Sequence, residues 1–190
     1  CGVATRRQAT ARFVPLRGKI VQVSRFSLTR FAEIAADDPL LAQWEELAQR
    51  DPRGGAFFCG PRWALSWFRA YREALGAELC VVAMHEVADS ATLVGLAPLY
   101  TRVARIAPGM KARELRLLGD AGPRPPCVDL VCASGAGPSF ARELAGWLVG
   151  SEAPEWDVLD LQPLCDPSSA RAYLAQGLEA VILFGDETKL

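Results

Sequence analysis

Apolar and polar positions alternate most regularly in the middle of the chain. Residues 92–100 form a run of branched and apolar side chains that predicts a strand, and residues 115–118 predict another one. The dipeptide Pro108-Gly109 lies between them and favours a turn. Pro98 has no amide proton to donate, so we expect the first of these strands to be irregular or unpaired near Pro98 and Gly95. The pattern predicts a β-hairpin at the centre of a sheet.

Helical periodicity occurs on both sides of this hairpin. Asp38-Pro39 is typical of an N-cap followed by the first residue of a helix, and the apolar stripe after it ends before Asp51. Phe57-Phe58 is expected to form a short apolar step after it. A second helix is predicted over residues 61–75, with Gly76 as its C-terminal cap. It has an aromatic ridge that we interpret as core: Trp63, Trp67, Tyr71 and Leu75. Two later helices are expected, one over residues 140–148 and one over residues 166–177.

The fold class follows from how these helices and the strands alternate. Further strands are predicted at residues 19–26, 78–86, 128–132, 156–162 and 180–184. Adjacent strands in the first half imply antiparallel hairpins, whereas helices between the later strands imply parallel crossovers. We therefore predict an α/β (α+β) fold with a mixed, twisted central sheet of about six to seven strands and about four flanking helices.

Charge divides the chain into two parts. Residues 1–32 contain seven basic residues and no acidic one, which leaves 14 basic and 22 acidic residues, a net charge of −8, in the remainder. We interpret residues 1–18 as a basic, flexible segment, with a targeting segment or a nucleic-acid arm as alternatives, and residues 19–190 as one domain. The negative body argues against a nucleic-acid partner.

Cysteine and histidine usage narrows the chemistry further. None of the six cysteines forms a Cys-x-x-Cys pair and no signal peptide is visible, which favours a reducing, cytoplasmic location without a disulfide framework. The single histidine, His85, lies in a predicted strand without the partners of a zinc site or a catalytic triad. We interpret it as structural and expect no metal. No apolar run reaches the ~18 residues that a membrane span requires.

A glycine-containing loop follows the strand predicted at residues 128–132. It reads Cys132-Ala-Ser-Gly135-Ala-Gly137 and precedes a predicted helix. Glycines let the backbone approach a phosphate, and amides at a helix N-terminus can donate to it. An ordinary strand-to-helix loop is the alternative, and Pro138 removes one amide donor.

The element order and this loop together resemble the GNAT (Gcn5-related) N-acetyltransferase superfamily, whose pyrophosphate loop reads R/Q-x-x-G-x-G/A. Cys132 stands where that family has Arg or Gln. The resemblance implies acetyl-CoA or another acyl-CoA as co-substrate. It also implies that the donor is bound by residues of this segment: Cys132, Ser134, Gly135, Ala136, Gly137 and Ser139.

Residues 166–178 are similar to another motif of that family, N-x-x-A-x-x-x-Y-x-x-x-G-F. They read Asp-Pro-Ser-Ser-Ala-Arg-Ala-Tyr-Leu-Ala-Gln-Gly-Leu. The resemblance makes Tyr173 the candidate general acid for the departing thiolate, with an interfacial aromatic role as the alternative. Asp129 is the candidate base, although alternation along a strand would also allow Asp129 and Asp160 to face solvent.

A narrower resemblance covers residues from about 20 to 165. An ordered set of segments is similar to the N-terminal half of the CelD/BcsL-like acetyltransferases, bacterial relatives of FemAB that are named for a link to cellulose biosynthesis: Phe57, the Trp63/Trp67 helix and residues 93–100, 113–119, 128–131 and 156–161. Those proteins carry two GNAT-like halves in tandem, and the second half usually holds the better-defined acyltransferase signature.

The resemblance implies an acyltransferase unit that moves an acyl group from acyl-CoA to an amine acceptor, in cell-envelope or exopolysaccharide metabolism. Its expected partners are these two small molecules and a second GNAT-like domain. One alternative is a non-catalytic N-terminal half that shapes the acceptor site or packs against a catalytic GNAT half. Another is an envelope or polysaccharide-assembly interaction module without a ligand pocket.

Overall fold

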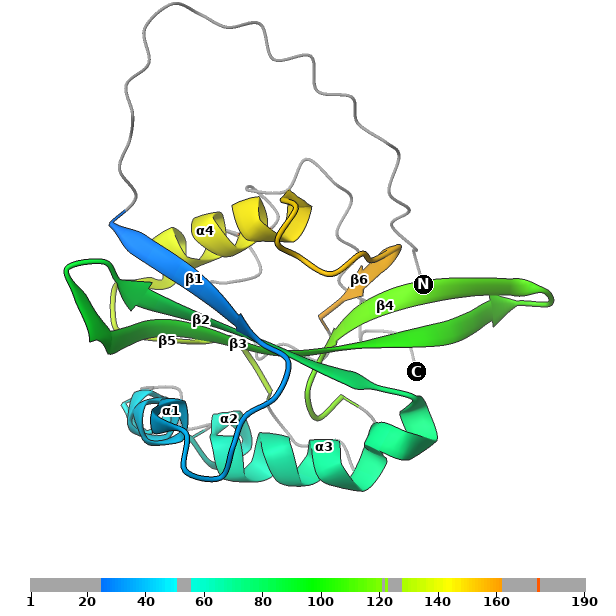
Figure 1. Ribbon diagram of the computed structural model, residues 1–190, viewed down its shortest axis with the longest axis horizontal. Helices are drawn as coiled ribbons and strands as arrows, with labels where there is room; N and C mark the ends of the chain where they lie inside the picture. The colour runs from blue at the N-terminus through cyan, green and yellow to red at the C-terminus, as the bar shows by residue number, and fades with distance from the viewer. Residues whose placement is uncertain (1–24, 51–55, 121, 123–127, 162–173, 175–190) are drawn as a thin grey trace, which may run out of the picture.

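A mixed sheet forms the centre of the computed structural model (Figure 1). The structure describes residues 25–50, 56–120, 122, 128–161 and 174. Its strands are β1 (Phe26–Phe31), β2 (Glu78–Glu86), β3 (Asp89–Ala107), β4 (Met110–Leu117), β5 (Val131–Cys132) and β6 (Val158–Asp160). They lie in the order β1-β2-β3-β4-β6, with β5 paired to β3. The helices in this part of the chain are α1 (Pro39–Gln49), α2 (Ala56–Cys59), α3 (Pro61–Leu75) and α4 (Gly137–Val149).

Helices cover both faces of the sheet (Figure 1). α1, α2 and α3 lie on one face, and α4 lies on the other. Alternate residues of β2 divide between two apolar clusters. Leu79, Val81 and Ala83 belong to the cluster that includes α1 and α3, here called the α1–α3 core. Cys80, Val82 and Met84 belong to the cluster that includes α4, here called the α4 core. β2 is therefore apolar on both faces, as a strand covered from two sides must be.

The helix boundaries confirm the predicted capping signals. The Asp38 carboxylate accepts a hydrogen bond of 2.9 Å from the amide of Leu40, and Pro39 is the first helical residue of α1. α3 begins at Pro61 and is closed by Gly76, whose φ of 58° lies in the left-handed region. Phe57 and Phe58, expected as a short apolar step, lie in the single helical turn α2. The Trp44 indole of α1 donates to the carbonyl of Cys59 at 2.7 Å and so joins α1 to α2.

β3 is longer than predicted, and its edge is shared by two strands. Its first half pairs with β5 at Gly95 and Leu96, and its second half pairs with β4 from Leu99 onward. Pro98 lies between these two pairings, and its carbonyl accepts from the amide of Leu118 at 2.8 Å. The amide and carbonyl of a strand residue point to the same side. The side on which Pro98 lacks a proton is therefore the side of β4, and it lacks the proton at the point where β4 ends, so no regular β4 residue needs that donor. The predicted irregularity is confirmed, since the register also shifts beside Gly95.

The second half of the fold makes the sheet mixed, as predicted. α4 connects β5 to β6, and β6 runs parallel to β4, with Arg116 opposite Asp160. The first described strand, β1, begins at Phe26, where the predicted strand ended; residues 19–24 lie outside the described residues. The helix predicted over residues 166–177 and the strand over residues 180–184 also lie outside them, apart from Leu174, which is fully buried.

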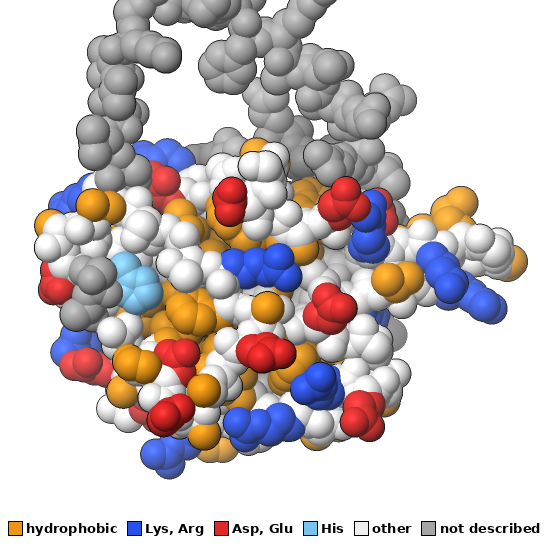
Figure 2. All heavy atoms as spheres, in the orientation of Figure 1, with side chains coloured by type: hydrophobic (Ala, Val, Ile, Leu, Met, Phe, Trp, Pro, Cys, Tyr) orange, Lys and Arg blue, Asp and Glu red, His pale blue; other side chains and the backbone are white. Residues whose placement is uncertain are grey.

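The surface combines both signs of charge. Acidic and basic side chains are interspersed over the face in Figure 2. The β3–β4 hairpin projects beyond the body of the sheet, at the right of Figures 1 and 2. Within the described residues, no helix has the length and apolar character needed to cross a membrane.

Candidate functional site

The predicted donor loop lies at the carboxyl end of β5, where the chain turns into α4. Gly135 has a φ of 77°, a conformation that side-chain-bearing residues rarely adopt, and a β-carbon placed there would meet nothing within 4 Å. Ser134 and Gly135 are exposed, whereas Gly137 is buried. The amide of Ala133 donates to Val94 at 2.9 Å and fixes the loop to β3. One side of the loop is therefore open to solvent.

The N-terminus of α4 has an uncapped first turn. Its N-cap residue, Ala136, has no side-chain oxygen and makes no side-chain capping hydrogen bond. The Ala136 amide is occupied by the carbonyl of Ala133 at 2.9 Å, and Pro138 has no amide proton. The amides of Gly137 and Ser139 are the remaining first-turn donors, at the positive end of the helix dipole. The first turn can therefore donate hydrogen bonds to an anion, but it has only these two backbone amides with which to do so.

Of the two predicted catalytic residues, only Asp129 lies in the described part of the chain. Asp129 is fully buried, and its Oδ1 accepts from the amide of Leu130 at 2.7 Å. The alternative that alternation turns Asp129 to solvent is therefore wrong, and a base role would require access that a fully buried carboxylate lacks. Tyr173, the candidate acid, lies outside the described residues.

Apolar residues that flank β5 and β6 are buried in the α4 core. Val128, Leu130 and Leu161 belong to the α4 core and are each at most 2% exposed. Trp156, in the same cluster, is 7% exposed, and its indole donates to the carbonyl of Leu148 at 2.9 Å. Up to Leu161, these strands enclose core rather than an open crevice.

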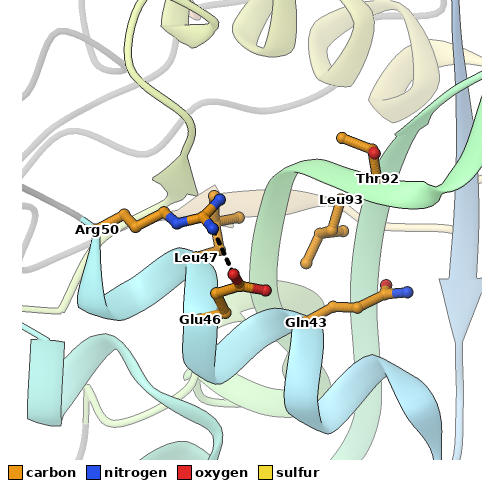
Figure 3. A pocket seen from close by; sticks show the side chains of 6 residues that line it. All are labelled: Gln43, Glu46, Leu47, Arg50, Thr92 and Leu93. Carbon is orange, nitrogen blue, oxygen red and sulfur yellow. Dashed lines mark hydrogen bonds and ion pairs between the residues drawn. The ribbon is translucent and has the colours of Figure 1, made fainter.

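A surface hollow of about 250 Å³ lies between α1 and β3 (Figure 3). Gln43, Glu46, Leu47, Arg50, Thr92 and Leu93 line it. Glu46 and Arg50 form an ion pair with each other, and both side chains are mostly exposed. Next to it, His85 Nε2 lies 3.1 Å from Gln43 Oε1, and burial lowers the pKa of His85. This contact supports the structural interpretation of His85, and the hollow contains no nucleophile and base in contact.

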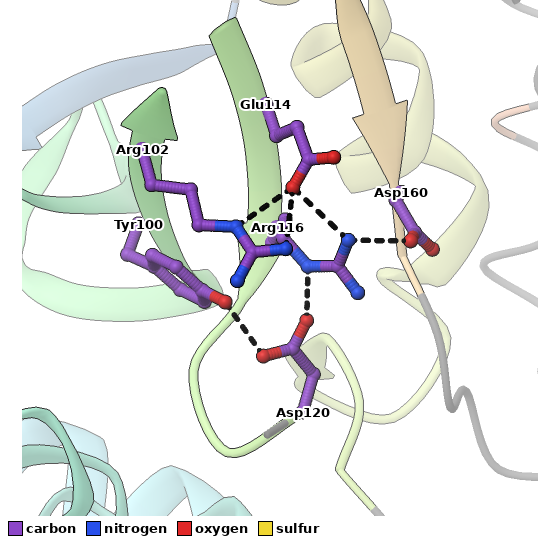
Figure 4. A network of polar contacts seen from close by, with 6 residues as sticks. All are labelled: Tyr100, Arg102, Glu114, Arg116, Asp120 and Asp160. Carbon is purple, nitrogen blue, oxygen red and sulfur yellow. Dashed lines mark hydrogen bonds and ion pairs between the residues drawn. The ribbon is translucent and has the colours of Figure 1, made fainter. Parts of the chain in front are cut away.

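The most organised polar group is a ladder across β3, β4 and β6 (Figure 4). Direct cross-strand register places Tyr100 opposite Arg116 and Arg116 opposite Asp160, and it places Arg102 opposite Glu114. Asp120 follows β4 and completes the group. We call these six residues the polar ladder: Tyr100, Arg102, Glu114, Arg116, Asp120 and Asp160.

Arg116 is the centre of the polar ladder. Its Nη1 lies 2.8 Å from Asp160 Oδ2 and 3.2 Å from Glu114 Oε2, and its Nε pairs with Asp120. Arg102 Nε donates to the same Glu114 oxygen at 2.7 Å. The Tyr100 hydroxyl donates to Asp120 Oδ1 at 2.7 Å. Three carboxylates thus meet two guanidinium groups, and the contacts are charge-assisted.

Burial controls the proton affinities in this group. The Asp120 side chain is only 1% exposed, and burial raises the pKa of its carboxyl although Arg116 and Tyr100 act in the opposite direction. Burial and the charge of Asp120 raise the pKa of Tyr100, which stays a neutral donor. Burial alone lowers the pKa of Arg116, but the charges of Asp120 and Asp160 outweigh it and raise the pKa overall. Tyr100 and Arg116 therefore keep their protons, which suits a structural network.

The remaining candidate chemistry on the described residues is limited. Cys59, Cys80 and Cys132 are free thiols there, and burial raises the pKa of Cys80 to about 11, so it stays protonated. No group of three or more His, Cys, Asp or Glu side chains within the described ranges is arranged to bind a metal ion.

Comparisons with known proteins add no family to this description. No protein-family model, no curated protein and no solved structure matches the chain.

Proposed function

We propose that this chain is an acyltransferase unit of GNAT-like architecture that transfers an acyl group from acyl-CoA to an amine. The observation that carries the proposal is the connection from β5 through the loop and α4 to β6. In this connection the sheet changes from antiparallel pairing to the parallel pair of β4 with β6. Open α/β sheets bind ligands outside the carboxyl ends of their strands, and the loop with Gly135 lies at the carboxyl end of β5.

Donor binding would use the open side of this loop. The amides of Gly137 and Ser139 and the hydroxyls of Ser134 and Ser139 are the groups available to the pyrophosphate of the donor. In the transfer step the amine nitrogen attacks the thioester carbonyl and gives up one proton to water. The carbon–sulfur bond breaks, and the departing thiolate takes a proton from the acid, which is reprotonated from water. Tyr173 is the proposed acid, and catalysis rests mainly on positioning.

A second candidate function is a non-catalytic half that supports a separate acyltransferase domain. Trp156, Leu161 and Val128, which flank β6 and β5, are buried in the α4 core, and this observation favours the non-catalytic half. Under this alternative the loop would connect two elements without binding a donor. The acceptor site would be completed by the partner domain.

Thermal unfolding of the full chain with increasing acetyl-CoA distinguishes the two. A specific site should stabilise the fold by about 2.7 kcal/mol at a hundredfold excess over the dissociation constant. Adenosine diphosphate without the pantetheine arm is the fragment control. A shift with both ligands would indicate binding through the pyrophosphate alone, whereas a shift with acetyl-CoA only would indicate that the acyl arm is also bound.

Gly135→Val and Gly109→Val form a matched pair for this test. Their φ values are 77° and 76°, and a β-carbon at either position meets nothing within 4 Å, so both variants carry the same kind of backbone strain. Only Gly135→Val should abolish the acetyl-CoA shift. No saturable shift in the parent chain would refute independent donor binding and favour the non-catalytic half.

A further inference from the structure

The β3–β4 hairpin has an exposed apolar tip. Val103 is 58% exposed, Ile106 is 42% exposed and Met110 is 55% exposed. These are three of the six large hydrophobic side chains that are exposed on the described residues. The tip, residues 106–110, reads Ile-Ala-Pro-Gly-Met and contains no charged or hydroxyl side chain. Exposed apolar residues grouped on one projection mark an interaction surface.

The same hairpin is basic along its length. Residues 101–113 contain four basic residues and no acidic one. Arg102 and Arg113, nearest the body, are paired with carboxylates: Arg102 with Glu114, and Arg113 with Glu155 and Asp157. The charges at the base of the hairpin are therefore neutralised within the fold.

The outer two basic residues are not neutralised in this way. Arg105 and Lys111 are directly opposite each other in the β3–β4 register, and both are exposed. Along the described residues neither has a carboxylate within ion-pair distance. Like charges opposite each other destabilise an antiparallel pair. An anionic partner at this position would offset that repulsion.

We propose that this hairpin docks on an anionic lipid membrane, with Ile106 and Met110 inserted at the headgroup–acyl boundary and Arg105 and Lys111 among the lipid headgroups. Apolar side chains combined with basic ones are what binding at an anionic membrane interface requires. A nucleic acid fits less well, because binding to its backbone generally uses about 6–10 phosphate contacts, and the hairpin offers two basic residues that have no ion-pair partner among the described residues. The inference does not depend on acyl transfer.

Sedimentation of the full chain with lipid vesicles tests the proposal. The parent chain should bind vesicles containing about a third phosphatidylserine far better than pure phosphatidylcholine, and added salt should weaken binding. The double variant Arg105→Gln with Lys111→Gln should lower the partition coefficient about 30-fold on the anionic vesicles. The double variant Ile106→Ser with Met110→Ser should lower it by at least about tenfold.

Matched variants elsewhere on the surface provide the controls. Val87→Ser with Val149→Ser removes two side chains that are 57% and 62% exposed, and Arg69→Gln with Arg142→Gln removes two exposed basic residues from helices. Both controls should bind within about twofold of the parent. Equal losses in hairpin and control variants, or no phosphatidylserine-dependent binding by the parent chain, would overturn the proposal. It would also be overturned if the hairpin variants left vesicle binding unchanged and instead removed binding to a duplex oligonucleotide or an acidic protein.

Discussion

Gly95 is predicted to be a position where even a methyl group destabilises the fold. It lies in β3 beneath α4, and a β-carbon built on its backbone would lie 2.6 Å from both Cγ and Cδ2 of Phe140. Phe140 is 1% exposed and belongs to the α4 core, so its ring has no free volume into which to retreat. Gly95 does not have a positive φ, so the substitution Gly95→Ala tests packing and not backbone strain.

The expected size of the effect combines two opposing terms. Overpacking a well-packed core costs about 1–3 kcal/mol. Replacing glycine by alanine within a strand returns about 0.5–1 kcal/mol, because the unfolded chain loses conformational freedom. We therefore expect Gly95→Ala to lower the free energy of unfolding by about 1–2 kcal/mol. For a chain of this size the midpoint of thermal unfolding should fall by roughly 5 °C.

Urea unfolding followed by tryptophan fluorescence measures this change, and a second glycine provides its control. Gly146 lies within α4 and is exposed, and a β-carbon placed there would have no atom within 4 Å. Gly146→Ala should therefore stabilise the chain by up to about 1 kcal/mol. Adding Phe140→Leu to Gly95→Ala should recover part of the loss, giving a coupling of about 1 kcal/mol. A Gly95→Ala variant as stable as the parent, or strict additivity with Phe140→Leu, would refute the close-contact explanation.

Three further substitutions test other parts of the fold by urea unfolding. Burial lowers the pKa of His85 in the folded chain below its ordinary value of 6.5, so protonation favours the unfolded chain and the free energy of unfolding should fall as the pH drops below about 6.5. His85→Gln should remove this pH dependence. If the pH dependence is unchanged in the variant, it belongs to other groups. Asp38→Ala removes the cap hydrogen bond to Leu40 and should cost about 1 kcal/mol, with Asp37→Ala, one residue outside the cap, as a near-neutral control. Arg116→Met leaves three carboxylates without their shared cation. It should lower the free energy of unfolding by about 3 kcal/mol at neutral pH and by less near pH 4, where carboxylates begin to be protonated. An equal loss of stability at both pH values would contradict the ionic explanation.

Elements with local sequence signals were predictable. Asp38-Pro39 and Gly76 set helix ends through the next few residues of the chain, and the structure confirms both. Pro98 and Gly95 likewise indicated a local irregularity in β3, and the register shift beside Gly95 confirms it. These signals require no knowledge of what lies far away in the sequence.

The polar ladder could not be predicted, because its contacts depend on register between distant strands. Asp120 follows Leu-Gly and precedes a stretch rich in glycine and proline, a context typical of an exposed turn, yet its side chain is 1% exposed. Arg116 is only four residues from Asp120 in the sequence, but the pairing of β3 with β4 is needed to bring Tyr100 to the group, and the parallel pairing of β6 is needed to add Asp160. The one available signal was the alternation of Tyr100 with Arg102 and of Glu114 with Arg116, at the i and i+2 spacing of one strand face.

The position of the polar ladder bears on where a ligand could bind. Arg116 ties β6, through Asp160, to the end of β4 and to Asp120 beyond it, so these segments cannot separate without exposing buried charges. Leu161, the residue after Asp160, and Val128 both belong to the buried α4 core. A donor that binds this part of the chain must therefore be held by the open side of the loop around Gly135, outside the packed strands. The response to adenosine diphosphate is for this reason the more informative arm of the ligand test, since the loop can contact a pyrophosphate without any opening of the sheet.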